Sequence, residues 1–177
     1  MPKNKYQKTR NTGKIQIICG LHAVRAALLN NKRNHEELYI TENNKQIGEN
    51  LRSKIKKITI LDQKEFKKLH GEIKSTQGIV LRTNDFERPS LQQFIKNENL
   101  KDKSILLALD QITDPQNIGS IMRSCALFNC TGVIVAKDNA PDLTASLYKA
   151  ASGAAELVNY FKVTNLKRSI FELKKYG

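Results

Sequence analysis

The residues best suited to chemistry lie within 20 positions, from Leu109 to Phe128. Asn117 stands where a helix is predicted to begin, so its amide can either cap free backbone N–H groups or hold a substrate hydroxyl. Arg123 follows six residues later, about one and two-thirds turns along and on another face of the helix. Judged by residue type alone, a helix cap and a solvated arginine are the simpler interpretations of these two side chains.

Other signatures of a catalytic or metal site are missing from the sequence. Cys19, Cys125 and Cys130 form no CxxC pair, and the three histidines cluster neither with them nor with each other. We therefore expect no structural metal site and no disulfide framework, with Cys125 and Cys130 as small buried hydrophobic residues. A reducing cytoplasm is the natural compartment for such a chain. Neither GxGxxG nor GxxxxGK[ST] occurs, so no common nucleotide-binding loop is present.

Composition and charge indicate a soluble globular protein with a polyanionic partner. The chain has 177 residues, 40% of them apolar, and no run of about 18 uncharged apolar residues that could span a membrane. The net charge is +13, and residues 1–104 hold 22 basic and 11 acidic side chains. Concentrated positive charge favours phosphate-rich partners because each neutralised phosphate releases a counterion. A lysine-rich surface selected for solubility, or reflecting genome composition, is the alternative.

Two basic segments supply the candidate contacts with nucleic acid. The first 14 residues carry five positive charges and no apolar stretch, which predicts a basic arm and no secretory signal. A second group lies on a predicted basic helix and the residues that follow it. The candidates are Lys3, Lys5, Lys8, Arg10 and Lys14 in the arm, and Lys45, Arg52, Lys54, Lys56 and Lys57 in the second group. A solvated charged face is the alternative for both.

Strands and helices are predicted to alternate along residues 15–85. The expected strands are Ile15–Cys19, Glu37–Ile40, Ile58–Leu61 and Gln77–Leu81, and the expected helices are His22–Leu29, Ile47–Ile55 and Gln63–His70. Asp62 can cap the third helix, whose Phe66 and Leu69 are expected to face inward. Residues 86–104 are polar and contain Pro89 and a short amphipathic stretch, so we interpret them as a linker with a short helix between two domains.

The C-terminal half, residues 105–177, has the pattern of a parallel α/β sheet. Its expected strands are Ile105–Asp110, Thr131–Ala136 and Leu157–Val163, and the first is apolar enough to be buried on both faces. Asp114 and Pro115 open a helix whose expected apolar face is Ile118, Ile121, Met122, Cys125 and Phe128, and Asn165 caps a last helix. Because three strands barely make one flank of a ligand site, we expect this domain to be incomplete.

Several motifs together resemble a known family. The matching positions are Leu109-Asp110, Asp114-Pro115, Asn117, Gly119, Arg123 and Phe128. They are similar to the first signature motif of the SpoU (TrmH) family of knotted RNA 2′-O-ribose methyltransferases. Gly20–Val24 and Gln77–Val80 resemble the N-terminal substrate-binding domain of the subgroup that modifies large-subunit ribosomal RNA. The resemblance covers most of residues 15–163.

This resemblance implies a fold and an activity. The fold would be a small ribosomal-protein-like α/β domain followed by a truncated parallel-sheet, trefoil-knot-type methyltransferase domain. The activity would be methyl transfer from S-adenosylmethionine to a ribose 2′-hydroxyl of structured RNA, expected to be ribosomal. Asn117 and Arg123 would be catalytic, with Arg123 clamping a phosphate and polarising the 2′-hydroxyl as its oxygen attacks the sulfonium methyl. The supporting residues would be Asp114, Gly119, Ser152, Gly153 and Glu156. A homodimer would follow if the catalytic domain is complete.

The chain departs from the family pattern at three points. Thr76 replaces the usual His before the Gln-Gly pair, and Asn129 replaces a Gly, although Asn also enters the left-handed region readily. The second and third motifs, with the residues that would bind the cofactor, are expected beyond Gly177. The run Ser152-Gly153-Ala154 also fits a tight packing surface. A non-catalytic RNA-binding remnant of such an enzyme is therefore the alternative to the enzyme itself.

Overall fold

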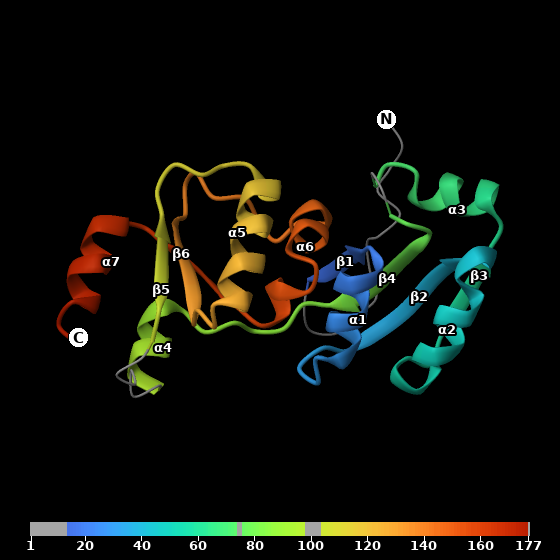
Figure 1. Ribbon diagram of the computed structural model, residues 1–177, viewed down its shortest axis with the longest axis horizontal. Coiled ribbons are helices and arrows are strands. Elements are labelled where there is room, and N and C mark those ends of the chain that lie inside the picture. The colour runs from blue at the N-terminus through green and yellow to red at the C-terminus, as the bar shows by residue number, and fades with distance from the viewer. Residues whose placement is uncertain (1–13, 74–75, 98–103, 177) are drawn as a thin grey trace.

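Two sheets lie side by side along the long axis of the molecule (Figure 1). The computed structural model describes residues 14–73, 76–97 and 104–176. The α/β fold class is confirmed, with the N-terminal half on the right of Figure 1 and the C-terminal half on the left. Within these ranges no helix has the length and apolarity that crossing a membrane requires. The basic-arm candidates Lys3, Lys5, Lys8 and Arg10 lie outside the described residues.

The N-terminal sheet is mixed, with strand order β1-β4-β2-β3. Its elements are β1 (Ile15–Cys19), α1 (Leu21–Leu29), β2 (His35–Thr41), α2 (Lys45–Leu51), β3 (Ile58–Leu61), α3 (Gln63–His70) and β4 (Ile79–Asn84). Strand β4 runs antiparallel to both β1 and β2, whereas β2 and β3 are parallel. Asp62 caps α3 as expected, because its carboxylate accepts from the backbone N–H groups of Lys64 and Glu65.

The C-terminal sheet has three parallel strands in the order β5-β6-β7, as the alternating pattern predicts. Its elements are α4 (Leu91–Asn97), β5 (Leu106–Leu109), α5 (Pro115–Leu127), β6 (Gly132–Ala136), α6 (Ala145–Ala151) and β7 (Asn159–Val163), followed by α7 (Leu166–Leu173). Phe94 of α4 packs on Phe161 of β7 in a cluster that also includes Leu173 of α7, so these two helices share one face of the sheet. Helix α5 covers the opposite face.

The two halves share one hydrophobic core. Val24 and Leu28 of α1 belong to the same buried cluster as Leu147 and Tyr148 of α6 and Met122 of α5. Helix α6 packs directly against β1, between the two sheets (Figure 1). The boundary between the halves is therefore a packed interface and not a flexible joint.

Four expectations about burial and one about helix length are wrong. Cys130, expected to be buried, is only partly buried at the edge of the core. Strand β5 is not buried on both faces, since Ile105 is 52% exposed and Leu107 39% exposed, because β5 is an edge strand in the described sheet. Leu69 and Phe128 are also exposed, each near the end of its helix where the chain turns away from the core. Helix α2 ends at Leu51 and continues as a 3₁₀ turn. The chain must turn back here so that β3 can begin beside β2, where the backbone O of Lys57 accepts a hydrogen bond from the backbone N–H of Leu38.

His70 is a buried side chain whose polar atoms lack partners. Its ring lies between Tyr39 and Phe66, with centroid separations of 4.8 and 5.0 Å, and neither ring nitrogen has a hydrogen-bond partner in the described structure. Burial lowers the pKa of the His70 imidazole below its ordinary value of 6.5. The unfolded chain therefore binds the proton at this histidine more readily than the folded chain does. The resulting contribution to the free energy of unfolding is fully present above about pH 6.5 and is lost as the pH falls below that value.

His70→Phe is expected to stabilise the fold by about 1–2 kcal/mol at pH 7, because it removes the unpaired polar atoms and keeps an aromatic ring. It should also reduce the loss of stability in acid. Part of that loss will remain, because burial and the charge of Arg33 lower the pKa of His35 as well. Urea unfolding at pH 7.0 and 5.5 measures both effects. Exposed His22→Phe is the control and should change neither. A less stable His70→Phe would show that the imidazole has a partner after all.

Candidate functional site

The first turn of α5 is capped by Asp114 and not by Asn117. The Asp114 carboxylate accepts a hydrogen bond from the backbone N–H of Gln116 at 3.0 Å, and Pro115 occupies the first helical position. Asn117 is exposed on that turn, and no side-chain hydrogen bond of it is found within the described ranges. The capping interpretation of Asn117 is therefore wrong, and its amide is available to a ligand.

Gly119 lets α5 and α6 approach closely. A Cβ atom at this position would lie 2.6 Å from the Cβ of Ala150 and 2.7 Å from the backbone O of Leu147. Both contacts are far inside van der Waals distance, and the second is to backbone, which cannot move aside. The small residue at 119 thus brings the side chains of α6 next to those of α5.

Arg123 lines an open groove between the two halves of the chain. Gln116 lies seven residues before it and therefore on the same face of α5. The polar lining consists of Gln116 and Arg123 from α5, Thr144 at the N-cap of α6, Ser146 and Lys149 from α6, Ser152 after it, and Glu72 from the N-terminal half. The groove has a volume of about 780 Å³. Two cations beside hydroxyl and amide groups form a surface suited to phosphate and ribose.

The predicted supporting residues separate into two places. Ser152, in the left-handed conformation with φ of 49°, lines the groove at the end of α6. Gly153, with φ of 96°, lets the chain pass within contact distance of α1, where a Cβ would lie 2.7 Å from that of Ala26. Glu156 lies away from the groove, in a buried ion pair with Arg33. The small-residue run is therefore both a packing surface and one edge of the groove.

The sequence profile described as the SpoU rRNA Methylase family matches residues 104–177, and the profile described as RNA 2′-O ribose methyltransferase substrate binding matches residues 17–89. The chain belongs to the SpoU methylase family. The substrate-binding region forms the sheet β1-β4-β2-β3, and the methylase region contains the groove residues Gln116, Arg123 and Lys149. The groove of this chain therefore lies where the substrate-binding region meets the methylase region.

Relatives with curated descriptions support this assignment. The chain is 35% identical over 172 residues to a 23S rRNA (guanosine-2′-O-)-methyltransferase RlmB of Coxiella burnetii, covering 93% of this chain and 67% of the relative. It is 32% identical over 168 residues to the RlmB of Nitrosomonas europaea, covering 92% and 64%. The chain thus spans about two thirds of the length of these relatives.

Solved structures show the same fold. The SpoU methyltransferase AviRb from Streptomyces viridochromogenes, solved in complex with the cofactor AdoMet, superposes with a TM-score of 0.68 at 15% identity, over 90% of this chain and 59% of that one. An AdoMet-bound rRNA methyltransferase from Sinorhizobium meliloti gives 0.66 at 16% identity, over 92% and 59%. At this level of identity the likeness concerns the fold alone.

At one position where this chain departs from the SpoU motif, the structure agrees with the prediction. Asn129, where the family has Gly, adopts φ of 54° just after α5, so the left-handed turn survives the substitution. Asn117 and Arg123 do not share a face of α5, which agrees with their spacing, and Asn117 is not part of the groove lining. Gln116, about two turns before Arg123 on the same face, lines the groove instead.

The second basic group is accessible but is not one helix face. Lys45 lies on α2, Arg52 and Lys54 in the 3₁₀ turn, and Lys56 and Lys57 in the segment before β3, all of them exposed. The ammonium of Lys57 lies 2.9 Å from the Glu37 carboxylate, which neutralises it. Exposed Lys14 lies 4.0 Å from Asp142, at the limit of an ion pair. Their contact with RNA stays a prediction.

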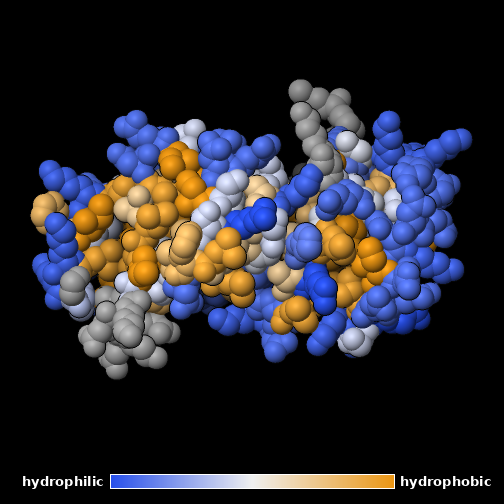
Figure 2. Space-filling model, viewed as in Figure 1, coloured by the Kyte–Doolittle hydropathy of each residue, from blue (hydrophilic) through white to orange (hydrophobic). Residues whose placement is uncertain are grey.

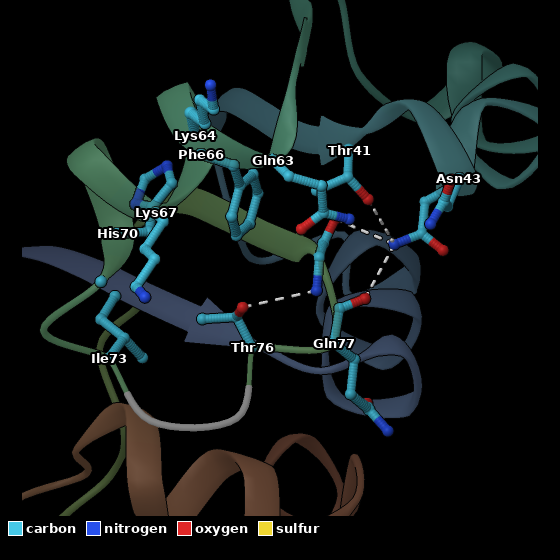
Figure 3. Close-up of a pocket in the computed structure, with 13 residues that line it drawn as sticks. Thr41, Asn43, Gln63, Lys64, Phe66, Lys67, His70, Ile73, Thr76 and Gln77 are labelled. Atoms are coloured by element: carbon cyan, nitrogen blue, oxygen red, sulfur yellow. Dashed lines mark hydrogen bonds between the residues drawn. The ribbon is translucent and has the colours of Figure 1, made fainter.

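A second hollow, on the N-terminal half, adjoins the groove (Figure 3). It is lined by polar side chains that include Thr41, Asn43, Gln63, Lys64, Lys67 and Thr76. Ile73 lines both hollows, so the two adjoin at this residue. Sequence reasoning did not select Lys64, Lys67, Lys149 or Gln116. For Gln116 the seven-residue spacing to Arg123 was an available signal, whereas Lys149 is brought to the groove by helix packing.

Proposed function

We propose that this chain recognises structured ribosomal RNA and positions a ribose 2′-hydroxyl for methylation with S-adenosylmethionine as methyl donor. The observation that carries this proposal is the groove, because it joins the substrate-binding region to Arg123 of the first SpoU motif. The RlmB relatives, described as 23S rRNA methyltransferases, support ribosomal RNA as the substrate. A cytoplasmic location follows from such a substrate.

The two cations of the groove and the nearby Asn117 have distinct parts in this proposal. Arg123 holds a phosphate beside the target nucleotide with its planar fork and polarises the 2′-hydroxyl with its positive charge. Lys149, from the neighbouring helix, neutralises a second phosphate as a point charge. Asn117 is exposed on another face of α5 and can hold a hydroxyl at the N-terminal end of that helix. The lysines of α3 add positive charge in the adjoining hollow.

We propose no S-adenosylmethionine pocket among the described residues. A doubly wound sheet binds its ligand beyond the carboxyl ends of its strands, here after Leu109 of β5 and Ala136 of β6. The groove reaches the segments after these strands only at Gln116 and Thr144, and the hollow beside Arg88 reaches them only at Asp142, Leu143 and Thr144. We therefore assign no described residue to the cofactor, and the proposed roles concern RNA.

The apolar surface of the C-terminal half favours a homodimer in the complete enzyme. Figure 2 shows apolar side chains gathered over this half of the molecule, whereas the N-terminal half is polar around one smaller apolar patch. Leu127, Phe128 and Leu157 are each at least three-quarters exposed. Large exposed apolar surface of this kind commonly marks an interface.

Binding of a structured ribosomal RNA fragment tests the proposal directly. The affinity of this chain should fall steeply between 50 and 200 mM salt, because phosphate contacts dominate. Arg123→Ala and Lys149→Ala should each weaken binding by about three- to tenfold and reduce the slope of log affinity against log salt by about one. Exposed Lys175→Ala at the far end of the chain is the control and should change neither. Filter binding at several salt concentrations measures both quantities.

Three outcomes would count against this function as proposed. Affinity that does not depend on salt would show that phosphate recognition is not the basis of binding. Equal effects of Lys175→Ala and Lys149→Ala would show that the groove has no special role. Loss of binding on changing Lys45, Arg52 and Lys54, with the groove variants unaffected, would place the RNA on the far side of the N-terminal half.

A further inference from the structure

A buried ion pair connects the two halves of the chain. The Arg33 guanidinium and the Glu156 carboxylate lie 2.8 Å apart, and their side chains are 0% and 3% exposed. Arg33 follows α1 in the N-terminal half, and Glu156 lies in a 3₁₀ turn between α6 and β7. The pair therefore spans the interface between the halves and contributes nothing to the groove lining.

Every N–H donor of Arg33 has an acceptor. Nε and one N–H of Nη2 donate to Glu156, and the second N–H of Nη2 donates to the Tyr148 hydroxyl at 2.8 Å. Nη1 donates to the side-chain O of Gln16 and to the backbone O of Asn84, both at 3.0 Å. The acceptors come from β1 and β4 on one side and from the C-terminal half on the other, so the guanidinium fixes the two in one relative orientation.

Neighbouring groups complete the network. The Tyr148 hydroxyl donates to Gln16 at 3.0 Å and accepts from Arg88 at 2.9 Å, and Asn30 donates to Glu156 at 2.6 Å. Burial alone would lower the pKa of the Arg33 guanidinium, but the hydrogen bonds and charge of Glu156 outweigh it and the pKa is raised. Arg33 thus remains charged at any pH where the protein is folded.

Such a pair is a poor source of stability. The cost of removing two charges from water roughly cancels their attraction, and apolar residues of similar volume often stabilise as well. An apolar contact, however, has no preferred direction, whereas eight hydrogen bonds around the side chains of Arg33 and Tyr148 fix one geometry. The groove needs one geometry, because Glu72 and Ile73 line it from one half and Arg123 and Lys149 from the other.

We propose that Arg33 and Glu156 are positioning residues, which set the docking of the RNA-binding half on the half that carries Arg123 and thereby the width of the groove. The inference rests on the proposed function for its RNA readout. Its structural part, the docking itself, is independent of that function.

The test compares three variants of the full chain. Glu156→Gln leaves the buried Arg33 without a counterion, so the urea midpoint should fall and RNA affinity should drop by about tenfold or more. Arg33→Met with Glu156→Met removes both charges, so the urea midpoint should return close to that of the unmodified chain. RNA affinity of this double variant should nevertheless stay about tenfold weaker, because the orientation is no longer fixed. Glu36→Gln breaks the 2.7 Å pair with Arg82 inside the N-terminal sheet and is the matched control, expected to keep its RNA affinity.

The outcomes separate positioning from stability. A double variant that regains both the urea midpoint and the RNA affinity would overturn the proposal, as would equal losses of affinity in Glu156→Gln and Glu36→Gln. If the double variant does not fold, Tyr148→Phe, which removes one hydroxyl and keeps the ring, should weaken RNA binding by about threefold. Unchanged affinity in that variant would also overturn the proposal.

Hydrogen exchange distinguishes this proposal from the proposed function. Without RNA, amides of α1 and α6 at the interface should exchange faster in the double variant, whereas those of β2 should not change. If the unmodified chain binds no RNA, the proposed function fails and the docking role is still decided by exchange. Unchanged exchange at α1 and α6 would refute the docking role.

Discussion

Replacing Arg123 by lysine, in a chain that carries the full length of its RlmB relatives, is expected to lower the turnover number for RNA methylation by about a hundredfold or more. Lysine keeps the positive charge in the groove, so long-range attraction to phosphate is retained. It loses the planar fork that can hold a phosphate and a ribose oxygen together. KM for RNA should change by less than about threefold, because the lost interaction belongs to the transition state.

Steady-state methylation with labelled S-adenosylmethionine measures this split. Lys149→Arg is the matched control, because it makes the reverse replacement, of lysine by arginine, at another position of the same groove. Its turnover number should stay within about threefold of that of the unmodified chain. A near-normal turnover number in Arg123→Lys would show that Arg123 acts only as a charge. A rise in KM with unchanged turnover would assign it to RNA binding alone.

Gly119→Ala should destabilise the chain by about 3 kcal/mol, although alanine is the better helix former by about 1 kcal/mol. The new methyl group would meet the backbone O of Leu147 and the Cβ of Ala150, so α5 and α6 must separate. Because these helices bring Arg123 and Lys149 together, RNA affinity should fall as well. Urea unfolding and filter binding measure the two effects.

Gly48→Ala on α2 is the matched control for that substitution. Its methyl group would meet only the end of the Ile40 side chain and a methyl group of Ile58, both of which can adjust. We expect a change within about 1 kcal/mol and unchanged RNA affinity. If Gly119→Ala is as stable as the unmodified chain, the approach of α5 to α6 is looser than these contacts imply.

Local features of the fold could be predicted from the sequence because they depend on neighbouring residues. Asp114 and Pro115 begin α5, Asp62 caps α3, and Asn129 takes the left-handed turn, each as its residue type favours. The SpoU motif likewise lies in one short stretch. These assignments need no knowledge of what packs where.

Features that depend on distant residues were missed. The strand order β1-β4-β2-β3 places the last strand of the N-terminal sheet between the first two, which alternation along the chain does not specify. The exposure of Leu107 depends on which strands flank β5. Glu156 pairs with a residue 123 positions away, so its motif position indicated a site and could not indicate the interface.

The core shared between the halves has a consequence for synthesis of the chain on the ribosome. Val24 and Leu28 acquire their partners Leu147 and Tyr148 only after about 120 further residues have been added. At roughly 5–20 residues per second, this interval lasts roughly 6–24 s. During that time the nascent N-terminal sheet presents an uncovered apolar face and an arginine without its counterion. Chaperone capture on the emerging polypeptide should therefore be strongest before α6 leaves the exit tunnel.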